Sequence, residues 1–161
     1  LRLVRTLVVG LGIALAARDA GGQAQSPPTY AEYRVDAIVG RGTAIQGGAG
    51  IVLPLGTYVR LGIDGAVGAT RTEGETRMSG RADAIARFLL DPFREAPFGL
   101  SLGGGLSVPY VRSNTRVRPY LTAVMDIEGR TRGNFTPALQ LGLGGGTRAG
   151  VIIRKSPPRW R

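Results

Sequence analysis

The chain has 161 residues, with 21 Lys+Arg against 11 Asp+Glu, a formal net charge of +10, 26 glycines, and neither cysteine nor histidine. The length fits a single domain. Because these two residue types are missing, the composition excludes disulfides, the usual serine and cysteine triads, most zinc sites and the commonest general base.

The first 24 residues have the features of a secretory signal peptide. Arg2 and Arg5 form a basic start, Thr6–Ala17 is an uncharged apolar run, and small residues follow it. The run is too short to span a bilayer as a helix, and a buried helix is the alternative interpretation. The expected organisation is a signal peptide over 1–24, a linker over 25–28 and a β-barrel over 29–161.

Eight strand-like segments follow the linker, and each alternates apolar with polar or small residues. Turn signals separate them, and no run with the helical period intervenes. We expect polar loops over 71–76 and 111–118, and strands near 30–40, 44–53, 58–70, 77–90, 98–110, 119–128, 139–143 and 148–154. Strands spaced this regularly indicate a sandwich or a barrel, and an even count of eight suits up-and-down closure.

The segment from Arg77 to Tyr110 shows the two faces of the sheet most clearly. Its second arm places Leu100, Leu102 and Leu106 on one face and only glycine and serine on the other. A glycine-serine face is too small for a solvated exterior and suits a narrow, crowded interior. The pattern is typical of a barrel with an apolar band towards lipid and a polar lumen, although a soluble β-sandwich hairpin is an alternative.

Charges on the polar face are nearly balanced in sign, as expected where desolvated charges must be paired. Seven arginines face six carboxylates if Arg77 and Arg154 are included. A turn centred on residue 74 would place Asp64 level with Ala84. The expected lumen charge network is Glu32, Arg34, Asp36, Arg60, Asp64, Arg81, Asp83, Arg87, Asp126, Glu128 and Arg148.

The fold class expected from these patterns is all-β: an eight-stranded antiparallel up-and-down β-barrel of the transmembrane type, after a cleaved signal peptide. Aromatic residues near the expected strand ends suit the interface girdles of such barrels. They are Tyr58, Phe98, Tyr110, Tyr120, Phe135 and Trp160.

The chain resembles the small bacterial outer-membrane β-barrel domain proteins. The resemblance covers residues 29–161 and rests on the signal segment, the eight alternating strands, and the sequence Arg87-Phe-Leu-Leu-Asp-Pro-Phe-Arg94 followed by Phe98-Gly-Leu-Ser-Leu-Gly-Gly-Gly105. It implies a barrel in the outer membrane of a diderm bacterium, with both termini periplasmic and the barrel-assembly machinery as a partner.

The function expected on these grounds is non-enzymatic, with a structural or surface-interaction role and no cofactor or metal. Outer-membrane lipids or lipopolysaccharide are the expected partners. Arg112, Arg116 and Arg118 would contact their phosphates, unless this segment is an ordinary solvated loop.

Two other function classes remain open from the sequence. A soluble periplasmic or secreted β-barrel would bind an apolar small ligand with its leucine-rich face turned inward. A membrane-embedded lipid-modifying enzyme would need a nucleophile with its base, and no spacing indicates one. Nucleic-acid binding is not expected, because the arginines alternate into a strand face and do not form one basic patch.

Overall fold

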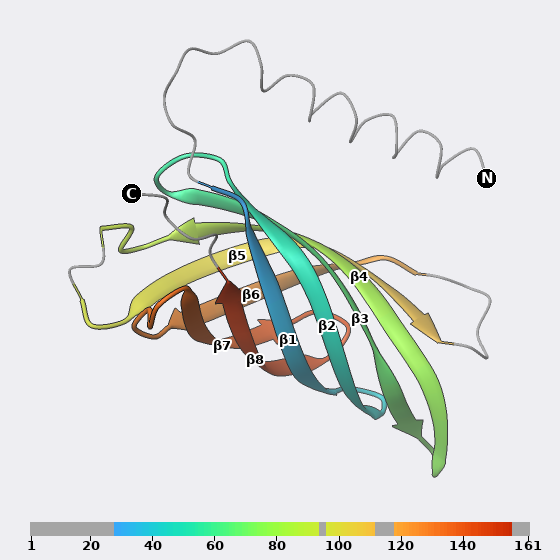
Figure 1. Cartoon of the computed structure of the whole chain (residues 1–161). Coiled ribbons are helices and arrows are strands. Elements are labelled where there is room, and N and C mark those ends of the chain that lie inside the picture. The colour runs from blue at the N-terminus through green and yellow to red at the C-terminus, as the bar shows by residue number, and fades with distance from the viewer. Residues whose placement is uncertain (1–27, 94–95, 112–117, 156–161) are drawn as a thin grey trace.

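The computed structural model describes residues 28–93, 96–111 and 118–155, and the structural statements below concern these ranges. The strands form one closed antiparallel barrel in chain order, with the last strand pairing with the first (Figure 1). Their bounds are β1 Tyr30–Val39, β2 Thr43–Pro54, β3 Val59–Thr72, β4 Glu75–Leu89, β5 Gly99–Val111, β6 Tyr120–Glu128, β7 Phe135–Leu143 and β8 Thr147–Lys155.

The expected all-β, eight-stranded up-and-down barrel is thereby confirmed. The expected signal peptide over 1–24, most of the expected linker over 25–28, and Trp160 lie outside the described residues.

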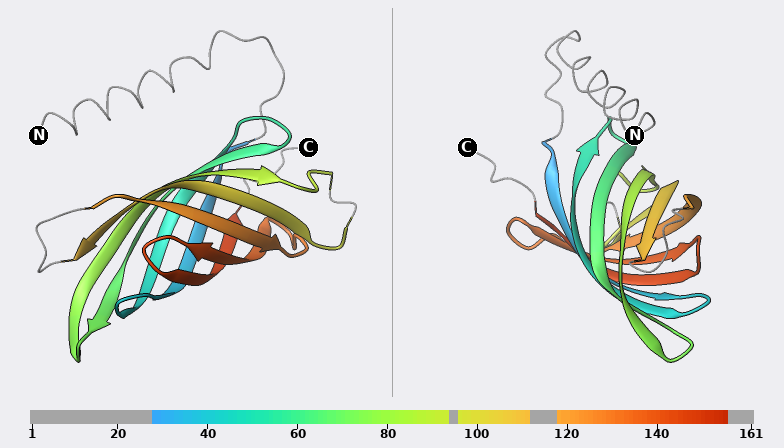
Figure 2. Two further views of the ribbon diagram at one scale, coloured as in Figure 1. Left: turned by 180° about the vertical axis from the view of Figure 1, so that it is seen from behind. Right: turned by 90° about the vertical axis from the view of Figure 1, so that its right-hand side faces the viewer.

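The barrel has two distinct ends (Figure 2). The turns after β1, β3 and β7 lie at one end, here called the loop end, where the β3–β4 hairpin reaches furthest (Figure 1). The start of β1 and the end of β8 lie at the other, here called the terminus end. The connections that follow β2, β4 and β6 also lie at the terminus end, as the antiparallel order requires.

The β3–β4 connection is shorter than the sequence analysis predicted. β3 continues to Thr72 and β4 begins at Glu75, so the turn consists of Glu73 and Gly74, whose φ angles are 52° and 85°. Two-residue hairpin turns use such positive-φ pairs because their twist matches that of the flanking strands. The predicted polar loop over 71–76 is therefore wrong, and the register places Asp64 opposite Asp83 rather than level with Ala84.

Glycines on the inner face allow the strands and the long side chains to share a narrow interior. A Cβ atom on Gly105 would lie 2.0 Å from the backbone oxygen of Ala84, and one on Gly62 would lie 2.2 Å from Nη1 of Arg87. Contacts this short cannot exist, so these positions accept no side chain unless the neighbouring strand or guanidinium moves.

Gly105→Ala is expected to lower the free energy of unfolding by about 1–3 kcal/mol, because the clash is with backbone that cannot rotate away. The matched control is Gly47→Ala on the outer face, where an added Cβ would meet nothing within 4 Å. That variant is expected to be neutral or stabilising by up to about 1 kcal/mol. Denaturant titrations of both variants check the prediction. Equal midpoints would contradict the close approach of β4 and β5.

The outer face of the barrel is apolar around its whole circumference. Among the described strand residues, the charged side chains at outward positions are Arg71 near the tip of the β3–β4 hairpin and Lys155 at the last position of β8. Large apolar side chains are exposed on every strand, among them Val35, Ile45, Val67, Phe88, Leu106, Leu121, Leu139, Leu141, Val151 and Ile153.

Exposed aromatic side chains gather at the terminus end. Tyr58 stacks on Phe88 with ring centroids 5.8 Å apart, and it meets Phe93 edge to face at 6.3 Å. Phe98 and Phe135 are exposed at the same end, as the sequence analysis predicted for strand ends. An aromatic belt therefore borders the apolar outer face on this side.

Candidate functional site: the charged interior and the terminus-end hollow

Ion pairs connect twelve charged side chains inside the barrel, and we call this set the lumen network. It is neutral, because six arginines balance six carboxylates. All members are buried except Arg60, which is partly exposed. The members are Arg34, Arg60, Arg81, Arg87, Arg148 and Arg154 with Glu32, Asp36, Asp64, Asp83, Asp126 and Glu128.

Arg154 on β8 organises the half of the network nearer the terminus end. It donates from Nε to Glu32 at 2.9 Å, from Nη1 to Glu128 at 2.5 Å, and from Nη2 to Asp126. Arg87 on β4 lies beside two of these carboxylates, with its Nε 3.0 Å from Asp126 and its Nη2 3.3 Å from Glu32. Four strands are thus cross-linked through the interior: β1, β4, β6 and β8.

Arg34 on β1 holds the middle of the network. It donates from Nε to Asp36 at 2.8 Å, from Nη1 to Asp64 at 3.0 Å, and from Nη2 to Gln140 on β7. The same Nη1 lies 3.5 Å from Glu32, which joins the middle to the terminus-end half. Its guanidinium therefore connects β3 with β7, which lie on opposite sides of β1 around the barrel.

Arg81 on β4 continues the network towards the loop end. Its Nε donates to Asp83 at 2.9 Å, its Nη1 to Gln46 at 2.9 Å, and its Nη2 to Asp36. Arg148 on β8 donates to the same Asp83 at 2.6 Å. Each of the three guanidinium nitrogens of Arg81 therefore has an acceptor within the barrel.

Neutral polar side chains complete the network, and the sequence analysis did not assign them to it. Ser107 donates to Asp83 at 2.5 Å, Gln140 donates to Asp126 at 2.7 Å, and Gln46 donates to Ser79 at 3.1 Å. The alternation of the sequence already placed Gln46 and Gln140 on the polar face of their strands. Ser107 and Asp83, like Gln140 and Asp126, are direct partners on neighbouring strands, so their contacts depend on the strand register, which the sequence does not fix.

The structure brings together all the residues expected to form the lumen charge network. Arg154, which the sequence analysis placed on the polar face but left out of the network, contacts three of its carboxylates. Arg77 differs from expectation. Its side chain is 49% exposed and pairs at 2.5 Å with Glu75 on the β3–β4 hairpin, beyond the buried network.

The arginines expected to contact lipid phosphates can be placed only in part. Arg118 is exposed, whereas Arg112 and Arg116 lie outside the described residues.

The interior is filled by side chains through the middle of the barrel. Apolar side chains occupy the inward positions that the network leaves, including Val52, Ile85, Val124 and Ile152. Breaking any one of these buried pairs leaves a desolvated charge behind, so the members hold one another in place. An eight-stranded barrel is just wide enough for side chains to fill it.

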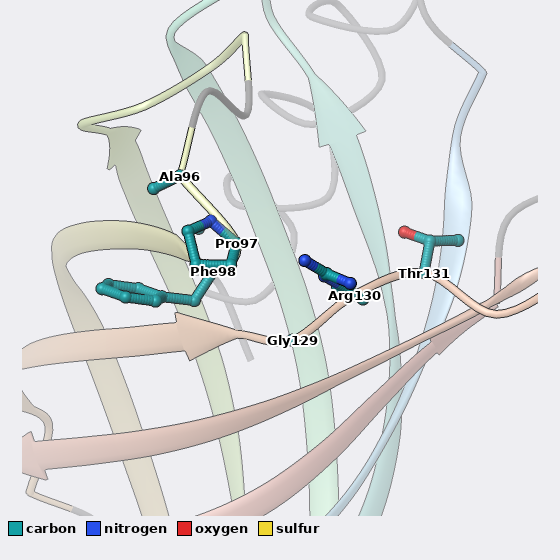
Figure 3. A pocket seen from close by; sticks show the side chains of 7 residues that line it. Ala96, Pro97, Phe98, Gly129, Arg130 and Thr131 are labelled. Atoms are coloured by element: carbon teal, nitrogen blue, oxygen red, sulfur yellow. The ribbon is translucent and has the colours of Figure 1, made fainter.

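A separate hollow of about 580 Å³ lies at the terminus end, between the β4–β5 and β6–β7 connections (Figure 3). Pro97 and Phe98 form one side, and Gly129, Arg130 and Thr131 form the other (Figure 3). Its described lining includes no member of the lumen network. The hollow adjoins the network at Gly99, where a Cβ atom would lie 3.7 Å from Oε2 of Glu128.

Comparison of the chain with models of protein families and with curated proteins found no match. Within the described ranges, no helix has both the length and the apolar character needed to cross a membrane.

Proposed function

We propose that this chain is a non-enzymatic β-barrel of the transmembrane type, embedded in the outer membrane of a diderm bacterium, with a structural or surface-interaction role. The observation that carries the proposal is the outer face, which is apolar around eight strands and, among the strand residues that the structure describes, has charge only at its two borders. Exposed apolar surface of this extent marks contact with another apolar phase.

The dimensions of the outer face support this proposal. The shortest strands have nine residues, which at about 3.3 Å per residue extend about 30 Å along the strand. At a tilt of about 40°, this gives about 23 Å along the barrel axis, near the apolar band of about 25 Å in membrane barrels. The aromatic belt at the terminus end suits one membrane interface.

The alternative of a soluble barrel with an apolar ligand inside receives less support. It needs the leucine-rich face turned inward, whereas Leu102, Leu106, Leu139 and Leu141 are exposed on the outside. The interior holds paired charges where an apolar ligand would need an apolar cavity. In water, this barrel would expose its apolar face to solvent.

The filled interior supports a structural role over that of an open pore. Its charged groups face partners rather than a continuous water column, so we expect no steady ion conductance. Lipid acyl chains would contact the outer face. Arg118, and Arg112 and Arg116 of the same connection, are proposed to contact lipid phosphates. Delivery by a signal peptide over 1–24 and insertion by the barrel-assembly machinery belong to the same proposal.

Cell fractionation tests the proposed location. The mature protein is expected to sediment with outer membranes, to remain there after washing with urea or alkaline carbonate, and to dissolve only in detergent. N-terminal sequencing of the same material is expected to start at Gln25. Recovery of folded protein in the supernatant without detergent would overturn the proposal.

A further inference from the structure

The loop end of the barrel contains a second cavity, of about 640 Å³, which we call the cup. Its floor is the end of the lumen network, where Arg81, Gln46 and Ser79 are hydrogen-bonded to one another in series. Its rim includes Arg41, from the β1–β2 turn, and Arg77, from the β3–β4 hairpin. The cup is thus a hollow with a polar, buried floor and a basic rim.

The charged residues that line the cup are all arginines: Arg41, Arg77 and Arg81. Arg81 is 6% exposed and gives its three guanidinium nitrogens to acceptors inside the barrel, so it fixes the floor. For Arg41, no ion pair is found among the described residues. Arg41 is exposed, so its donors are accessible from the cup.

Arg77 is exposed at the rim of the cup, where Glu75 is one of its partners. It contacts Glu75 from Nε and Nη2, but the side chains are 49% and 67% exposed. Exposed ion pairs of this kind contribute little to stability, so an anion that replaces Glu75 beside Arg77 sacrifices little interaction energy. A planar guanidinium can bind a phosphate or carboxylate through two parallel hydrogen bonds to two oxygens. In its pair with Glu75, Arg77 instead directs both Nε and Nη2 at the single oxygen Oε2.

One wall of the cup is held rigidly by contacts between turns. The ring of Tyr120 lies against Gly145, where a Cβ atom would be 2.5 Å from the ring. Gly145 has a φ of 67°, and its carbonyl lies 3.0 Å from the position of a Cβ on Gly40 in the β1–β2 turn. The turn that carries Arg41 is therefore packed against the wall that carries Tyr120. Binding of a ligand would therefore not need to order these two turns.

We propose that the cup binds a small anionic ligand whose phosphate or carboxylate group is held by Arg41 and Arg77. Thr70, Thr72 and the floor residue Ser79 also line the cavity, and their hydroxyls suit a ligand body that carries hydroxyl groups. A sugar phosphate has this chemistry, whether free in solution or as the headgroup of a lipid. The proposal depends on the loop end alone, so it holds whether or not the outer face meets lipid.

Titration of the folded full-length protein in zwitterionic detergent tests the proposal. The probes are inorganic phosphate, glucose 6-phosphate and neutral glucose, and the readouts are the backbone amide resonances of Ser79 and Gly145. Glucose 6-phosphate is expected to shift both resonances in a saturable way, inorganic phosphate to do so more weakly, and glucose to leave them unchanged. A further titration with phosphatidylglycerol added to the micelles distinguishes a lipid headgroup from a free ligand as the source of the anion.

The decisive variant is Arg41→Gln combined with Arg77→Gln, which is expected to weaken binding by about tenfold or more. Arg130→Gln, at the opposite end of the barrel, is the matched control and is expected to bind like the wild type. Unchanged unfolding midpoints show that the double variant is folded, since both arginines are exposed. Equal shifts with glucose, unchanged affinity in the double variant, or no response to any of the anions would overturn the proposal.

Discussion

Asp36→Asn is expected to lower the free energy of unfolding by about 3–5 kcal/mol, the usual cost of breaking a buried ion pair by removing one partner. Asp36 is fully buried and accepts hydrogen bonds from both Arg34 and Arg81, joining the middle of the lumen network to its loop-end part. Asparagine has nearly the same shape, so the loss reports the charge rather than a cavity. Urea titration of the refolded barrel measures it.

Two further variants provide unfolding free energies with which the loss in Asp36→Asn is compared. Glu75→Gln removes a carboxylate from an exposed pair with Arg77 and is expected to cost at most about 1 kcal/mol. Asp64→Asn is expected to fall between the two. Within the described ranges, Asp64 pairs with Arg34 alone, and it lies opposite another carboxylate, Asp83. A midpoint for Asp36→Asn equal to that for Glu75→Gln would mean that the interior is solvated.

Val151→Arg is expected to destabilise the lipid-embedded barrel by about 2–4 kcal/mol, the cost of arginine near the middle of a bilayer. Val151 is 55% exposed on β8, and its register partners on either side are Val35 and Leu139. It therefore lies near the middle of the apolar outer face. Because the side chain is exposed, the same substitution on a soluble barrel would change the free energy of unfolding by at most about 0.5 kcal/mol.

The matched control for Val151→Arg is Leu55→Arg. Leu55 is 57% exposed, as Val151 is, but it lies in the β2–β3 turn beyond the strands. Both variants are refolded into phospholipid vesicles and unfolded in denaturant. A large loss for Val151→Arg with a small one for Leu55→Arg is the expected result. Two small losses would contradict lipid contact at the outer face.

The faces of the strands could be predicted from the sequence because strand geometry fixes the parity of side chains. Glu32, Arg34 and Asp36 alternate with Tyr33 and Val35, and the structure buries the first set and exposes the second. The same parity holds for the charges of the lumen network on β3, β4 and β6. Alternation therefore determined which residues meet inside, once the number of strands had indicated closure.

The contacts within the interior could not be predicted in the same way. The contact of Arg34 with Gln140 and that of Arg148 with Asp83 depend on how the closed barrel staggers its strands, which no local pattern records. The β3–β4 register was missed by one residue because Glu73 adopts a positive φ and so permits a two-residue turn. Because residue 73 is not a glycine, the sequence did not indicate a positive φ at this position.

The central claim is that the outer face of this barrel contacts lipid, and a spin label tests it most directly. The chain contains no cysteine, so Val151→Cys and, as a control, Thr72→Cys in the β3–β4 hairpin each provide a single labelling site. With the protein in lipid vesicles, the label at 151 is expected to collide more often with oxygen, which concentrates in the bilayer, than with a water-soluble nickel chelate. The label at 72 is expected to show the reverse order. Greater access of the nickel chelate than of oxygen to the label at 151 would contradict the claim.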